Sequence, residues 1–122
     1  MNEALIQTLK LCEKSAAWFG VHIHSLDQRN NLNDTPLHTV CSWGELAPVK
    51  VLIKYGADVN ACGDIGATPI FNAVIGGNAE VVKFLIQSGA NLSIKNNTGR
   101  SVINYAKNIS ASEDIIGLLL GR

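Results

Sequence analysis

The sequence predicts an all-α solenoid of helix-turn-helix-hairpin units with a cap at each end. One observation is a step of 33 residues that relates Thr35-Pro36 to Thr68-Pro69. A second is an apolar stripe at i, i+3 and i+4 spacing, Val49, Leu52 and Ile53, which is typical of a helix with one buried face. Repeats of this length indicate a stacked array in which each unit packs against its neighbours.

The 33-residue step recurs in several independent columns of the sequence. It relates Gly44 to Gly77, Gly56-Ala57 to Gly89-Ala90, Val40 to Ala73 and Ala106, and Leu52 to Leu85 and Leu118. The Thr-Pro pair weakens to Ser101-Val102 after the next step. We therefore divide the single domain into a cap over residues 1–29, repeats over 30–62 and 63–95, and a C-terminal capping repeat over 96–122.

The N-terminal cap is predicted as an amphipathic helix or helix pair over residues 2–20, because this stretch has neither a Thr-Pro start nor an inter-helix glycine. Its apolar residues are Leu5, Ile6, Leu9, Leu11, Cys12, Ala16, Trp18 and Phe19. Terminal units of a solenoid cover a core face that would otherwise be exposed, which explains their departure from the repeat.

Each of the two close repeats begins with a threonine that can cap a helix and a proline suited to the first helical position. A glycine about ten residues later ends this first helix, and the apolar stripe marks the second. Gly56 and Gly89 follow the second helix, where a left-handed cap is expected. The polar segments 58–64 and 91–98 then lead on as extended, hairpin-like connections.

The C-terminal unit supplies the last helix within residues 110–122. We expect Ile115, Ile116, Leu118 and Leu119 to pack inward and Leu120 to stay partly exposed. In total the sequence predicts five to eight helices and no extensive sheet.

The stretch Thr35-Pro36-Leu37-His38-Thr39-Val40 resembles the ankyrin signature T-P-L-H-x-A, and residues 55–61 resemble the closing G-A-D-V-N-A stretch of that family. The resemblance covers about residues 30–122. It implies a protein-binding array in which the motif histidine, His38, braces a hairpin by a hydrogen bond. Phe71 and Asn104 replace this histidine in the later units, and Asn33 stands where those units have Gly66 and Gly99.

Composition and charge argue against several classes of function. Ten Lys and Arg balance ten Asp and Glu, so no basic footprint for nucleic acid is present. No run of eighteen apolar residues predicts a membrane span, and the N-terminal stretch lacks an export signal. Three sparse cysteines suit a reducing compartment, so we expect a cytoplasmic protein.

No motif predicts catalysis or a cofactor. His38 and Cys41 lie three residues apart on one helix, but the histidine fits a structural role and the cysteine a small buried position. His22 and His24 would face the same way in an extended segment, yet the sequence supplies no further ligand for a metal ion. We therefore expect a non-enzymatic protein without metal or cofactor.

Recognition is expected on the concave face that the ankyrin resemblance implies, lined by hairpin tips and the exposed edge of each first helix. We call the following nine positions the recognition strip: Leu32, Asp34, Trp43, Asp64, Ile65, Ile75, Asn97, Arg100 and Ile109. Trp43 is the foremost candidate anchor, because tryptophan is enriched among interface hot spots. The alternative is that Trp43 packs over the turn before Gly44.

The leading hypothesis is stoichiometric binding of another protein, a toxin, an enzyme or a signalling protein, by a chain that is a monomer when free. Twelve Ile and twelve Asn are typical of AT-rich coding sequence, and the chain resembles small ankyrin proteins among bacterial immunity proteins. This favours an inhibitor that neutralises a toxin. The alternatives are a eukaryotic-style adaptor or regulatory inhibitor and a structural subunit that self-associates.

Overall fold

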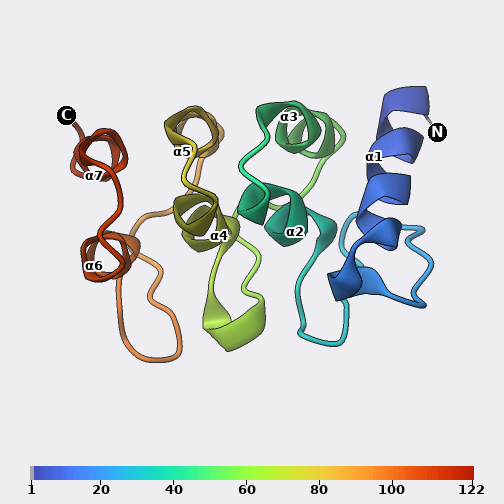
Figure 1. Ribbon diagram of the computed structural model, residues 1–122, viewed down its shortest axis with the longest axis horizontal. Helices are drawn as coiled ribbons and strands as arrows, with labels where there is room; N and C mark the ends of the chain where they lie inside the picture. Colours follow the sequence, from blue (N-terminus) through green and yellow to red (C-terminus); the bar gives the residue numbers. More distant parts are fainter. Residues whose placement is uncertain (1) are drawn as a thin grey trace.

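The computed structural model describes residues 2–122, which form a solenoid of stacked helix pairs (Figure 1). Within that range it has seven α-helices and two short 3₁₀ turns, and no strand is formed. The predicted all-α solenoid is therefore confirmed. The termini lie at opposite ends of the row, α1 at one end and α7 at the other.

The three units begin with the helices α2 (Pro36–Ser42), α4 (Pro69–Gly76) and α6 (Val102–Asn108), which form one row. A second row holds their partners, α3 (Leu46–Lys54), α5 (Ala79–Gln87) and α7 (Glu113–Leu119). The connecting loops project beyond the first row (Figure 1). The predicted helix starts at the two Thr-Pro pairs are correct, with Pro36 and Pro69 in the first turn.

Glycines end the helices in the way the sequence predicts. Gly44 and Gly77 follow the first helices with φ of 71° and 77°, and Gly56 and Gly89 follow the second with φ of 103° and 99°. Glycine adopts these left-handed φ values with little strain, whereas β-branched residues do not. The glycine spacing therefore sets where each helix stops. Gly44 also lies against the Gly76 carbonyl, so a β-carbon there would collide with backbone of the next unit.

The core runs continuously through the stack, from Leu5 and Leu9 at one end to Ile115 and Leu119 at the other. The stripe residues Val49 and Leu52 and their counterparts Val82 and Leu85 have no exposed surface. Leu120 is 45% exposed, as expected, while Ile116 and Leu118 are only partly buried. None of the helices within residues 2–122 combines the length and apolar character needed to cross a bilayer.

The N-terminal segment lies differently from the repeats. α1 (Glu3–Lys14) runs across the end of the stack, roughly perpendicular to the helices that Figure 1 shows end-on, and contacts both α2 and α3. The turn η1 (Ala16–Trp18) follows, and the fully buried Trp18 donates its indole N–H to Thr39 Oγ1 at 2.8 Å. Two apolar residues of this segment do not pack inward, because Leu11 is 54% and Phe19 87% exposed.

Candidate protein-binding surface

The three hairpin tips are built on the same backbone hydrogen bond, repeated every 33 residues. The N–H of Asn30, Gly63 and Asn96 donates to the carbonyl four residues on, at 2.9, 2.8 and 3.0 Å. In the first and third tips the asparagine side chain also accepts two backbone N–H groups. The tips are thus closed locally, and their outer residues are held in place without a sheet.

Neighbouring tips are joined to each other. The Asp34 carboxylate accepts the N–H of Asp64 at 2.9 Å, and the Ile65 carbonyl accepts the N–H of Asn97 at 2.8 Å. Asp34 is half-buried, and a β-carbon at Gly63 would overlap its carboxylate. Asp34 therefore has a structural task that the sequence did not predict, because its hydrogen-bond partner lies 30 residues away.

Ile65 occupies an unusual backbone conformation in the turn η2 (Asp64–Gly66), with φ of 52° and ψ of 25°. The left-handed region costs an L-residue about 1–2 kcal/mol, and branching at the β-carbon makes it worse. Its side chain is nevertheless 54% exposed, so core packing does not explain the strain. Such strain is a feature of functional sites.

Four strip residues, Asp34, Asp64, Ile65 and Ile75, line one hollow of about 90 Å³, which we call the tip hollow. Its other walls are Ala67, Phe71, Asn72 and Tyr105. Sequence reasoning missed Asn72 and Tyr105. They stand 33 residues apart, in the repeat column that begins at Thr39. This column lies three residues before that of Ile75, on the same face of the first helix, so the repeat period could have identified both residues.

The remaining strip residues do not line this hollow. Arg100 lines a separate hollow of about 400 Å³ with Asn104, Lys107 and Asn108, which we call the basic hollow. Leu32 and Ile109 are 54% and 41% exposed and line neither. Trp43 is half-buried against the core at the end of α2, so part of its ring serves packing, the alternative that the sequence left open.

His38 is part of a buried hydrogen-bond network. Its Nδ1 accepts the Thr35 N–H at 3.1 Å and lies 2.9 Å from Thr35 Oγ1, while Nε2 lies 3.0 Å from the Ala67 carbonyl. The ring is therefore the neutral Nε2–H tautomer, which braces the next hairpin as expected. Burial lowers the pKa of His38, against an opposing effect of Asp34.

Cys41 is fully buried on the same helix, and burial raises the pKa of its thiol. A thiol in this state is a poor nucleophile. Both nitrogens of His38 are already occupied, so the two side chains are built for packing and bracing.

His22 and His24 lie at the N-terminal end, with ring centroids 6.1 Å apart. Glu13 Oε2 lies 2.7 Å from His22 Nδ1 and accepts the Ile23 N–H at 2.6 Å, which ties this loop to α1. No three His, Cys, Asp or Glu side chains in the part of the chain described here are grouped to hold a metal ion.

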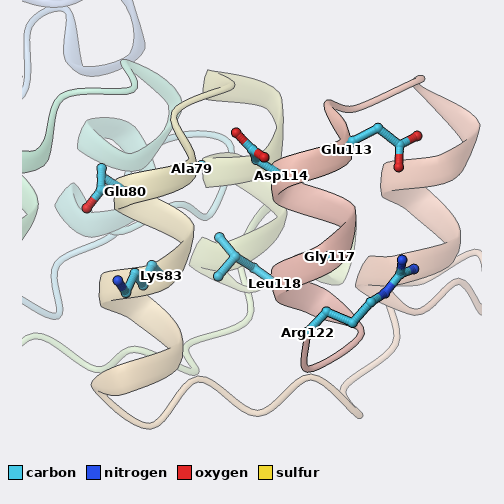
Figure 2. A pocket seen from close by; sticks show the side chains of 8 residues that line it. All are labelled: Ala79, Glu80, Lys83, Glu113, Asp114, Gly117, Leu118 and Arg122. Carbon is cyan, nitrogen blue, oxygen red and sulfur yellow. The ribbon is translucent and has the colours of Figure 1, made fainter.

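A hollow of about 520 Å³ lies on the opposite row, between α5 and α7. We call it the outer groove. Figure 2 shows Leu118 in the space between the two helices and Glu113 on the side of α7 away from α5. Its other charged residues are Glu80, Lys83, Asp114 and Arg122. With mixed charges and the half-buried Leu118 as its one large apolar residue, it offers no exposed anchor.

A family model for ankyrin repeats, three copies, matches residues 2–96 and 49–122. The chain belongs to the ankyrin-repeat family. Ankyrin repeats are protein–protein interaction modules, and the family is typically non-catalytic.

Relatives share the repeats within longer proteins. An ADP-ribosylation factor GTPase-activating protein of Arabidopsis thaliana is 33% identical over 64% of this chain, and Palmitoyltransferase AKR1 of Debaryomyces hansenii is 30% identical over 77%. Protein phosphatase 1 regulatory subunit 27 of Mus musculus is 35% identical over 62%. The chain spans 10%, 11% and 49% of these three proteins. The activities in the first two names belong to those whole proteins.

Proposed function

We propose that this ankyrin-repeat chain is a non-enzymatic protein that binds another protein stoichiometrically through its recognition strip. The observation that carries the proposal is the exposure of large apolar side chains around the tip hollow. Ile65 is 54% and Ile75 56% exposed, and the backbone of Ile65 lies in the left-handed region. Apolar side chains gathered at a hollow support an interface far more than scattered ones do.

We further propose that the free chain is a monomer and that binding inhibits or masks the partner. We consider two kinds of partner protein. A toxin neutralised by a bacterial immunity protein is favoured by the Ile- and Asn-rich composition. A regulated enzyme or signalling protein is favoured by the similarity to a phosphatase regulatory subunit, half of whose length this chain spans.

The test uses two double variants of the full chain and the partner co-purified with the parent. Ile65→Asn with Ile75→Ser removes the apolar rim without adding charge. Leu11→Ser with Leu120→Ser removes side chains that are 54% and 45% exposed elsewhere. Circular dichroism and denaturation first establish that both variants are folded, and calorimetry then gives affinity and stoichiometry.

We expect one chain per partner and an affinity about 30-fold or more lower for the rim variant, the ratio for a lost hot spot of about 2 kcal/mol. The control variant should bind like the parent. If the folded rim variant binds as tightly as the parent, recognition lies in the outer groove or on the cap, and the proposed surface is wrong.

A further inference from the structure

The tip hollow combines apolar walls with carboxylates. Ile65 and Ile75 form its exposed rim, and Tyr105 packs edge-on against the buried Phe71 ring behind them, with centroids 5.6 Å apart. The hollow has a volume of about 90 Å³, which suits the end of one extended side chain. It therefore offers a small space with both apolar and acidic walls.

The charge of the hollow has one sign. Asp34 and Asp64 are its ionisable acids, and no cationic side chain lines it. The Asp34 carboxylate is held in place by the Asp64 N–H. The Asp64 carboxylate is exposed, and within residues 2–122 it makes no hydrogen bond or ion pair. It is thus free to meet a charge from outside.

Neither Arg29 nor Arg100 lines the tip hollow, so neither neutralises its carboxylates from inside. Arg29 donates through Nη1 to the carbonyls of Asn33 and Cys62, at 2.7 and 2.6 Å, and so is engaged at the edge of the neighbouring hairpin. Arg100 lines the basic hollow instead. The helix α6 contributes to both hollows, because Asn104 lines the basic hollow and Tyr105 lines the tip hollow.

A side chain with an aliphatic stem and a cationic end matches both the apolar walls and the carboxylates of the tip hollow. Lysine and arginine lay their methylene groups on apolar surface and keep the charged head beside acceptors. Tyr105 offers an aromatic surface to the same stem or head. The basic hollow, with Arg100 and Lys107, repels a second cation and favours a carboxylate.

We propose that the tip hollow is the subsite for a lysine or arginine side chain of the bound protein, with an acidic residue of the same segment over the basic hollow. This inference rests on the proposed function and names the chemistry of the partner. The occupant is a polypeptide segment with charges of opposite sign, in a set order along the strip.

The test is selection from a displayed library of random linear peptides on four immobilised full-length proteins. These are the parent, Asp64→Asn, Lys107→Gln, and Glu80→Gln as a matched loss of one exposed carboxylate on the opposite row. We expect peptides from the parent and from Glu80→Gln to share a basic residue between apolar ones. A selected peptide should bind Asp64→Asn at least tenfold more weakly, and Lys107→Gln should reduce the enrichment of acidic residues.

Different failures point to different errors. If peptides lose binding to the Ile65→Asn, Ile75→Ser variant but share no basic residue, the strip binds proteins and the inference is wrong. If they bind this variant as well as the parent, the proposed function itself fails.

A second measurement decides the case in which the library yields no binder. The labelled parent protein is titrated with N-acetyl-arginine amide and, separately, with N-acetyl-leucine amide. Backbone amide shifts at Ile65 and Asn72 that arise with the arginine probe, and vanish in Asp64→Asn, support the subsite. Equal responses to both probes, or none, overturn it.

Discussion

Two joints between units can be compared, because the same 33-residue template builds both. At the first joint, His38 connects the cap of α2 to the Ala67 carbonyl of the next unit by hydrogen bonds. At the second joint, Phe71 occupies the equivalent position and packs edge-on against Tyr105. One joint is polar and the other aromatic, although both side chains are buried.

The difference shows what a substitution in the motif changes. The first joint satisfies all its polar groups, since Thr35 Oγ1 lies 2.9 Å from His38 Nδ1. At the second joint the equivalent hydroxyl, Thr68 Oγ1, is buried and has no hydrogen-bond partner within the part of the chain described here. An aromatic joint gains buried apolar area but leaves a polar atom without a partner.

The largest effect is expected for Phe71→Ala at the aromatic joint. Phe71 is 2% exposed, and truncating a buried phenylalanine costs about 3–5 kcal/mol because it removes apolar contact and leaves a cavity. Urea denaturation would measure the loss in free energy of unfolding. A cost below about 1 kcal/mol would mean that Tyr105 collapses into the space and that the joint is not a stabilising contact.

A smaller loss, about 2–3 kcal/mol, is expected for His38→Ala at the polar joint. The variant leaves the buried Thr35 N–H without its partner and removes one of the two donors to the Ala67 carbonyl, which keeps the Gly63 N–H. A buried polar group left unpaired costs about 1–3 kcal/mol. His24→Ala is the control, because His24 is exposed and should change stability by less than about 0.5 kcal/mol. Equal results for the two variants would contradict the bracing role of His38.

The regular part of the fold was predictable because its signals are local and periodic. The Thr-Pro starts and the glycines with positive φ determine the helix ends. The departure at Asn33 also has a local reason. Asn33 has φ of 71°, like Gly66 and Gly99 in the same column, and asparagine tolerates this region better than most residues.

The irregular parts depend on contacts distant in sequence. The direction of α1 across the stack and the exposure of Phe19 follow from docking, which an amphipathic pattern does not specify. The site was predicted in part. Its apolar residues share a column or a tip, but the hydrogen bond from the Asp64 N–H to Asp34 joins two units, and no sequence pattern indicates the left-handed backbone of Ile65.

A matched pair of threonine substitutions tests the same comparison, with expected changes of about 1 kcal/mol in the free energy of unfolding. Thr68→Val should stabilise the protein, because it replaces a buried hydroxyl without a partner by a methyl group of similar shape. Thr35→Val should destabilise it, because that hydroxyl lies on His38 Nδ1. Denaturation midpoints measure both effects, and shifts of the same sign would show that the two caps do not differ.

The last prediction is that acidification weakens the polar joint. Nδ1 of His38 accepts the Thr35 N–H, so a proton on Nδ1 would place two N–H groups against each other. The pKa of this ring is lowered from 6.5, and burial is the main cause. The unfolded chain therefore takes up this proton at a higher pH than the folded chain. The stabilisation is complete above about pH 6.5 and is lost as the pH falls from there toward the folded-state pKa.

We expect the free energy of unfolding of the parent to fall between neutral pH and about pH 5, a range in which carboxylates with ordinary pKa values near 4 remain ionised. His38→Gln, which cannot titrate, should be less stable at neutral pH but lose less on acidification. Phe71 gives the second joint no such dependence. Unfolding curves at several pH values, with His24→Gln as the control, measure the difference, and parallel pH profiles for His38→Gln and the parent would assign the titration to another group.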